Sequence, residues 1–174
     1  MLTRLTQSDF NELYAIIKES FPKNETRPKN AQRALFEKDE FRAYGVKSES
    51  GDLRAFITFW KLSGFTYGEH FAVAEKERGA GLGSEIIKEA VRLAGNRFCL
   101  EVEPPETEIA KRRIRFYGRC GFTLNGYDYL QPPLGKDRAA VPLMIMSTNG
   151  ALTPAEFEAV KAEIYKNVYG VEAK

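Results

Sequence analysis

The stretch Arg78-Gly79-Ala80-Gly81-Leu82-Gly83-Ser84 is the part of this sequence that decides the fold. It lies between a β-like run, residues 67–73, and a strongly helical run, residues 82–93. Its three glycines let the backbone approach a ligand closely, because no Cβ atoms stand in the way. The free amides and the positive dipole end of a helix N-terminus favour an anion. The stretch therefore predicts a phosphate-bearing ligand held on backbone N–H groups.

Three β-strands are predicted before the glycines. Residues 41–46 alternate in period two, and residues 53–62 are rich in β-branched and aromatic side chains. A Ser-Gly-Asp turn at 50–52 joins these two runs in a hairpin. Ser63-Gly64 then turns the chain into the run at 65–73. The three strands are expected to form an antiparallel meander that leads into the glycine stretch.

The remaining elements surround this meander. Apolar side chains at helical spacing predict a first helix, from Phe10 to Phe21, and a last helix, from Pro154 to Val168. The other expected elements are a strand at 2–5, a polar loop at 22–30, a short helix at 31–36, a strand at 98–102, a helix at 106–120, and strands at 122–129 and 141–146. This order predicts an α+β sheet with one embedded β-α-β crossover.

Two other glycine-rich motifs fit this stretch less well. A P-loop ends in Gly-Lys-Ser/Thr, and no lysine lies between Gly83 and Ser84. A Rossmann fingerprint is a closer rival, because residues 79–81 begin a G-x-G pattern and acidic residues follow about 20 positions later. However, the polar run at 74–78 separates the strand from the glycines, whereas a Rossmann turn follows its strand at once.

Residues 78–83 resemble the R/Q-x-x-G-x-G/A signature of the GNAT superfamily of acyl-CoA-dependent N-acyltransferases. The approach through Val73, Arg78 and Gly79 is similar to the family's V-x-P-x-x-R-G pattern, without its proline. The stretch 116–122, Phe-Tyr-Gly-Arg-Cys-Gly-Phe, resembles the family's second hallmark, Y-x-x-x-G-F. A position that often carries a cofactor-contacting asparagine in the family is Ala110 here, so that contact is not carried over.

The resemblance implies the GNAT fold, a mixed and mostly antiparallel sheet of six to seven strands, flanked by helices, with splayed central strands. Residues 1–148 would form the N-acetyltransferase domain. Residues 149–174 would form a C-terminal helical extension packed on that domain.

The resemblance also implies acetyl-CoA, or a close acyl-CoA, as a co-substrate in a cleft between the strands 67–73 and 98–103. The amides of 79–84 would bind the pyrophosphate, and the strand edge at 71–73 would hydrogen-bond the pantetheine arm as an added strand does. The expected cofactor-binding residues are Phe71, Ala72, Val73, Arg78, Gly79, Ala80, Gly81, Leu82, Gly83, Ser84 and Tyr117. No metal is expected, because the chain has a single histidine and its two cysteines lack metal-site spacing.

Direct transfer to an amine requires two proton movements: the ammonium loses a proton before attack, and the leaving thiolate gains one. Tyr117 is the candidate acid, because the motif places its hydroxyl near the sulfur and a phenol with a pKa of about 10 stays protonated at neutral pH. Glu69 is the candidate base, since residues 69, 71 and 73 share one face of a regular strand. Glu103 or a water chain are the alternatives. His70 would point to the opposite face and is expected to pack or to cap.

The resemblance implies an N-acetyltransferase that acts on a primary amine of a small molecule or peptide in a ternary complex. A non-catalytic acyl-CoA-binding module of the same fold is the alternative. An acceptor pocket could be lined by the loops at 22–30 and 131–140, with Tyr14, Phe36, Trp60, Tyr127 and Tyr129. A homodimer through the last strands or the last helix is also compatible with the sequence.

The composition sets the remaining limits. The chain has 174 residues, 43% of them hydrophobic, which suggests one domain with a well-filled core. Its formal net charge of +2 does not favour binding to nucleic acid or to membranes. No apolar run approaches the roughly 20 residues that span a bilayer, and residues 1–10 contain no apolar signal core. The expectation is a cytoplasmic protein with neither nucleic acid nor membrane as a partner.

Overall fold

The computed structural model describes residues 1–79 and 81–172, so the expected cofactor residue Ala80 lies outside the described residues. Within them a mixed sheet has the strand order β1-β2-β3-β4-β5-β8-β6, and β7 pairs with β8 beside this path. The elements are β1 (Thr3–Arg4), α1 (Phe10–Ser20), α2 (Lys29–Ala34), β2 (Phe41–Lys47), β3 (Leu53–Lys61), β4 (Phe65–Val73), α3 (Leu82–Ala94), β5 (Arg97–Val102), α4 (Glu108–Arg119), β6 (Thr123–Leu124), β7 (Tyr129–Gln131), β8 (Val141–Ser147) and α5 (Pro154–Ile164). The predicted α+β architecture is confirmed.

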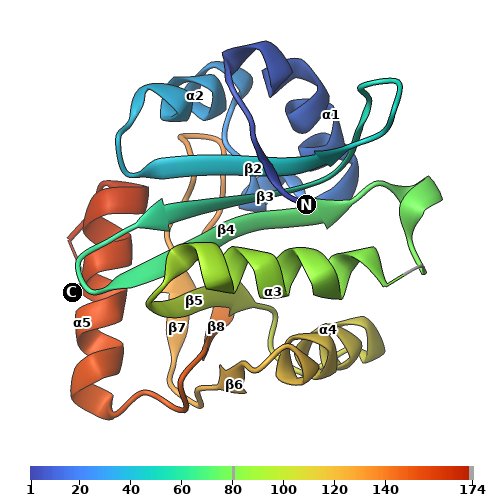
Figure 1. Cartoon of the computed structure of the whole chain (residues 1–174). Coiled ribbons are helices and arrows are strands. Elements are labelled where there is room, and N and C mark those ends of the chain that lie inside the picture. Colours follow the sequence, from blue (N-terminus) through green and yellow to red (C-terminus); the bar gives the residue numbers. More distant parts are fainter. Residues whose placement is uncertain (80, 173–174) are drawn as a thin grey trace.

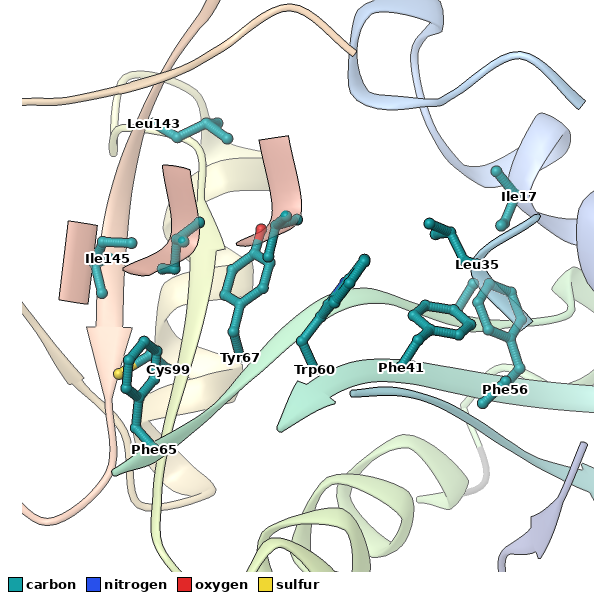
Figure 2. Packing of buried hydrophobic residues seen from close by; sticks show 14 of the residues in the cluster. Ile17, Leu35, Phe41, Phe56, Trp60, Phe65, Tyr67, Cys99, Leu143 and Ile145 are labelled. Carbon is teal, nitrogen blue, oxygen red and sulfur yellow. The ribbon is translucent and has the colours of Figure 1, made fainter. Parts of the chain in front are cut away.

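Helices cover both faces of the sheet, and a hydrophobic core lies on each face (Figure 1). One core lies under α1 and α5, and Figure 2 shows it running from Ile17 through Phe41, Trp60 and Tyr67 to Ile145. The second core lies under α3 and α4 and is centred on aliphatic and aromatic residues of β3, α3 and β5. Opposite faces of the same strands therefore belong to different cores.

The last helix belongs to the first core. Its buried residues are those that the sequence spacing predicted, Phe157, Val160, Ile164 and Val168. Thr153 begins the helix with a capping box, in which its hydroxyl accepts from the Glu156 amide and the Glu156 carboxylate accepts from the Thr153 amide. The α-helix ends at Ile164, and a single π-helical turn, Tyr165–Tyr169, follows it.

Strands β4 and β5 run parallel but remain paired over only four residues. Their register pairs Phe65 with Arg97 and ends with Gly68 opposite Leu100. Beyond that point β4 continues on β3 as far as Val73, while β5 continues on β8. The predicted splaying of the central strands is confirmed, and it opens a gap in the middle of the sheet.

A β-bulge lies in β4 directly after the last pair with β5. Thr58 of β3 pairs with His70, whereas Phe59 pairs with Gly68, so Glu69 has no partner in the ladder. A bulge inserts one extra residue and redirects the side chains that follow it.

The bulge places Glu69 and His70 on the same face of the sheet. Glu69 accepts a hydrogen bond from Trp60 of the first core, and His70 packs against Phe21 after α1. Phe71 stacks instead on Phe116 of α4, on the opposite face. The expectation that residues 69, 71 and 73 share a face, with His70 on the other, is wrong because it assumed regular alternation.

The predicted strand at 122–129 is also different in the structure. Two short strands, β6 and β7, take its place, and both pair with β8. Between them the side-chain amide of Asn125 donates to the Ile145 carbonyl at 3.0 Å and to the Ser147 hydroxyl at 3.1 Å. The Asn125 side chain therefore bonds to β8 where the strand is interrupted.

The burial of α5 predicts that it unfolds together with the sheet. Phe157→Ala should lower the free energy of unfolding by about 3–5 kcal/mol, because it leaves a cavity in the first core. Urea denaturation followed by circular dichroism measures this value. The exposed neighbour Glu158 offers a matched control, and Glu158→Ala should change it by about 0.5 kcal/mol or less. A separate early transition for the last helix would contradict a shared core.

Candidate active site

A cavity of about 630 Å³ lies where β4 and β5 part. Its lining includes Tyr67 and Leu143 from the first core, together with Ile87, Phe98 and Tyr117 from the second. The cavity therefore passes through the sheet and connects its two faces. A second cavity of about 490 Å³ is lined by the glycine stretch and shares several residues with the first.

The glycine stretch forms a cradle at the start of α3. Gly79 and Gly81 have φ angles of 93° and 82°, and a Cβ at either position would project into open space. Gly81 is the N-cap of α3, and its carbonyl accepts from the amides of Ser84 and Glu85. The preceding amides of this turn, those of Leu82 and Gly83, have no acceptor four residues back within the helix and favour an anion.

Three cations line the same second cavity: Arg78, Lys88 and Arg119. They add positive charge to the dipole end of α3. The Arg78 side chain is held by its Nε–H, which donates to the Val73 carbonyl at 3.0 Å. The glycine backbone and these side chains together fit a diphosphate group.

The predicted cofactor residues are brought together by the structure. Phe71, Ala72, Val73, Arg78, Gly83 and Tyr117 line the first cavity, and Gly79, Gly81, Leu82 and Ser84 line the second. The β5-facing edge of residues 71–73 has no strand partner among the described residues, because the pairing of β4 with β5 ends at Gly68. An extended group could add to this edge as a strand does.

Tyr117 lies on α4, on the second-core side of the cavity. Its ring packs against Phe116 and Phe122, and the residue is 8% exposed. Burial raises the pKa of Tyr117 to about 12. Its phenol therefore carries a proton throughout the neutral range and can donate it.

Glu69 lies on the opposite side of the sheet and is already paired. Its carboxylate forms an ion pair with Arg27, and its second oxygen accepts from the Trp60 indole at 3.1 Å. Burial acts to raise the pKa of Glu69, but the charge and hydrogen bond of Arg27 outweigh it and hold that pKa below its usual value. Glu69 is therefore a stable negative charge and a weak proton acceptor.

Arg27 was not identified from the sequence as part of the site. It lies in the loop at 22–30, is 6% exposed, and also donates from Nη2 to the Val168 carbonyl at 3.0 Å. The loop is polar throughout, and nothing in its pattern distinguishes the cation that turns inward.

Glu101 was also missed. It lies in β5 and lines the cavity, with Oε1 accepting from Tyr129 and both carboxylate oxygens accepting from Tyr169, at 3.0 and 2.9 Å. Burial raises the pKa of Glu101 to about 7; the tyrosine hydrogen bonds oppose this rise, and the charge of Glu69 adds to it. A charged residue between Leu100 and Val102 in a buried strand was the available sequence signal.

The remaining candidates are also placed. Glu103 pairs with Arg113 at the rim of the cavity. His70 lines the cavity, and its Nε2 lies 2.9 Å from the Glu25 carbonyl, as expected for a capping histidine. Burial raises the pKa of Cys99 to about 12, so it is an inert core thiol.

The expected acceptor pocket is confirmed only in its loops. They contribute Glu25, Gln131 and Leu134 to the lining of the cavity, whereas the five expected aromatics, Tyr14, Phe36, Trp60, Tyr127 and Tyr129, do not line it.

A family model described as acetyltransferase (GNAT) family matches residues 10–122. The chain belongs to the GNAT family. A GNAT-family protein from Bacteroides thetaiotaomicron is 31% identical, with 99% of each chain covered and a TM-score of 0.87. A chimera of the spermidine N-acetyltransferase SpeG from Vibrio cholerae with hSSAT is 14% identical over 85% of this chain and 93% of the other, with a TM-score of 0.65, and shows the shared fold. No curated protein matches the sequence.

This GNAT protein is therefore an acyltransferase, and its family uses acetyl-CoA. Within residues 1–79 and 81–172, no cluster of histidine, cysteine and acidic side chains is arranged to hold a metal ion. In the same part of the chain, no helix has the length and apolar character required to cross a membrane.

The raised pKa of Glu101 predicts a pH-dependent stability difference. The folded protein binds the Glu101 proton more tightly than the unfolded chain, so this carboxyl favours folding at low pH and loses that contribution as pH rises through about 7. Glu101→Gln should therefore gain about 1–3 kcal/mol of unfolding free energy relative to the wild type between pH 5 and pH 8. Urea denaturation at both pH values measures the difference. The same change at exposed Glu158 should show no such trend.

Proposed function

We propose that this protein transfers an acetyl group from acetyl-CoA to a primary amine of a small molecule or peptide, by direct attack in a ternary complex. The observation that carries the proposal is the cavity through the sheet. One of its mouths adjoins the glycine cradle and Tyr117, and the other is lined by acidic and aromatic side chains. Two substrates can therefore meet in it from opposite faces.

The donor side would be held mainly by backbone. The cradle at 79–84 would bind the pyrophosphate, and the free edge of β4 at 71–73 would hydrogen-bond the pantetheine arm. Acetyl-CoA supplies the thioester whose carbonyl carbon the amine attacks. Fixing both reactants in one cavity contributes much of the catalysis in such a reaction.

Two side chains would have chemical roles. The Tyr117 hydroxyl donates a proton to the leaving sulfur, and its raised pKa keeps that proton available. Glu69 was predicted as the base, and this role stays a prediction. Its ion pair with Arg27 supports a second role, in which its charge stabilises the positive charge that develops on the attacking nitrogen.

Removing the Tyr117 hydroxyl tests the transferase reaction. Tyr117→Phe should lower kcat by about 100-fold or more, because the leaving thiolate loses its proton donor. Release of free CoA thiol from acetyl-CoA, followed against a panel of amines, measures this loss. The dissociation constant for acetyl-CoA should change less than about twofold. If the wild type binds acetyl-CoA but transfers to no amine, a non-catalytic acyl-CoA-binding module becomes the better description.

Filling the glycine cradle tests the donor site. Gly81→Ala should weaken CoA binding about tenfold or more, measured by calorimetry, because the new Cβ enters the space intended for the pyrophosphate. Gly64→Ala is a matched control, since Gly64 has nearly the same φ, 81°, with open space around it, and lies outside the cradle. Both changes should cost about 1–2 kcal/mol of stability. Equal CoA affinity in the two variants would contradict the assignment of the cradle.

A further inference from the structure

The cavity contains a second carboxylate that differs from Glu69 in its partners. Glu69 is paired with the cation Arg27, whereas the partners of Glu101 are phenols. Tyr129 and Tyr169 donate to Glu101, and the Tyr67 hydroxyl lies 3.1 Å from the Tyr169 hydroxyl. Among the described residues, no cation forms an ion pair with Glu101. A carboxylate has about four lone-pair sites, and two tyrosine donors do not occupy all of them. Glu101 can therefore accept a further hydrogen bond from a ligand in the cavity that it lines.

We propose that Glu101 forms the acceptor subsite, where its carboxylate binds the ammonium group of the amine and takes a proton from it. This inference rests on the proposed function and assigns the base to a residue other than Glu69. The amine enters as R–NH₃⁺, one proton moves to a Glu101 oxygen, and the freed electron pair on nitrogen attacks the thioester carbon. A C–N bond forms and the C–S bond breaks.

The remaining protons balance through Tyr117 and solvent. The sulfur receives its proton from the Tyr117 hydroxyl, and Tyr117 is reprotonated by the second proton that leaves the nitrogen. Glu101 returns its proton to water, so one proton is released for each amide formed. No oxidant, metal or further reactant is required.

The electrostatic surroundings suit Glu101 to this role better than Glu69. A general base is most effective when its pKa lies near the working pH. Burial brings the pKa of Glu101 to about 7, while Arg27 lowers that of Glu69. The titratable groups that face Glu101 are Tyr67 and Glu69 from β4, Tyr129 from β7, and Tyr165 and Tyr169 from the π-helical turn.

The π-helical turn positions both carboxylates. Tyr169 donates to Glu101, and the adjacent Val168 carbonyl accepts from Arg27, which pairs with Glu69. Such turns are rare and occur frequently at functional sites. Residues 165–169 are therefore a positioning element of the acceptor subsite.

His70 leaves one unpaired hydrogen-bond acceptor in the lining of the cavity. The Glu25 carbonyl can only accept, so Nε2 of His70 carries its hydrogen and Nδ1 is left as an acceptor. Nδ1 is buried, has no partner among the described residues, and lies 3.9 Å from a Glu69 oxygen, which is also an acceptor. An N–H group of the amine could donate to this nitrogen.

The same side disfavours an anionic substituent. Glu25, Glu69 and Glu101 line it, and the buried cation Arg27 is already bound to Glu69 and to the Val168 carbonyl. A carboxylate next to the reacting amine would meet Glu25 and Glu101, while the nearby cations Arg27 and Arg113 are already paired with Glu69 and Glu103. The substrate class is therefore an amine that carries no carboxylate on the carbon beside its nitrogen.

Glu101→Gln tests the subsite and keeps the shape of the side chain. It should lower kcat/KM by about 100-fold and remove the limb of the pH profile near pH 7, while the dissociation constant for acetyl-CoA stays unchanged. Tyr169→Phe should shift that limb, and Tyr127→Phe, which removes a hydroxyl bonded to the Leu152 carbonyl away from the cavity lining, should not. Thermal unfolding confirms that each variant is folded.

Two results of this experiment would overturn the inference. One is a Glu101→Gln enzyme with the wild-type rate and pH profile, and the other is loss of the limb in Glu69→Gln alone. A wild type that transfers to no amine would instead contradict the proposed function itself. A second measurement does not depend on turnover. In protein without acetyl-CoA, ¹³C NMR of the glutamate carboxyls should show that 2-phenylethylamine lowers the pKa of Glu101. An unchanged Glu101 signal would contradict ammonium binding there.

Matched amines test the substrate class. 2-Phenylethylamine and phenylalanine differ by one carboxylate, as do ethylamine and alanine. In each pair that reacts, the amine without the carboxylate should have a kcat/KM at least about tenfold higher, since the like charges cost about 1.4 kcal/mol or more. An equal or higher kcat/KM for the amine that carries the carboxylate would contradict the proposed substrate class.

Discussion

The site depends on the point at which β4 and β5 stop pairing. Four residue pairs hold the strands together, and a Cβ at Gly68 would lie 2.5 Å from the Phe98 ring, so this contact requires glycine. After Gly68, β4 remains hydrogen-bonded to β3, and β5 remains hydrogen-bonded to β8. Each strand therefore loses hydrogen bonds along one edge only. The core on either face remains packed, and the cavity between the strands can join the two faces without unfolding either.

The bulge at Glu69 determines what faces this opening. Without the extra residue, either Glu69 or His70 would lie on the α3 and α4 face, beside the donor site. With it, both side chains lie on the α1 face, and the ion pair with Arg27 becomes geometrically accessible. The bulge therefore separates the polar acceptor side from the more apolar wall formed by Phe71 and Phe116.

The sequence identified the residues that line the expected donor half of the cavity, but few of those that line the expected acceptor half, and the reason is physical. The cradle at 78–84, the helix that follows it and Tyr117 belong to local motifs, whose geometry is set by neighbouring residues. The acceptor half is built by contacts between distant positions, 42 residues apart for Arg27 and Glu69 and 68 apart for Glu101 and Tyr169. A bulge also leaves no signal in a period-two pattern, so the face of Glu69 relative to Phe71 could not be read from the sequence.

Charge is segregated within this one cavity, although the net charge of the chain is only +2. Arg78 and Arg119 lie toward the cradle, while Glu25, Glu69 and Glu101 lie on the opposite side of the sheet. The other acidic lining residues, Glu77 and Glu103, are paired with Arg54 and Arg113. An anionic donor and a cationic acceptor would each be attracted to their own mouth and repelled from the other. This arrangement would hold the two proposed substrates at opposite ends of the cavity, and because the opposed charges cancel in the whole chain, its net charge carried no information about the acceptor.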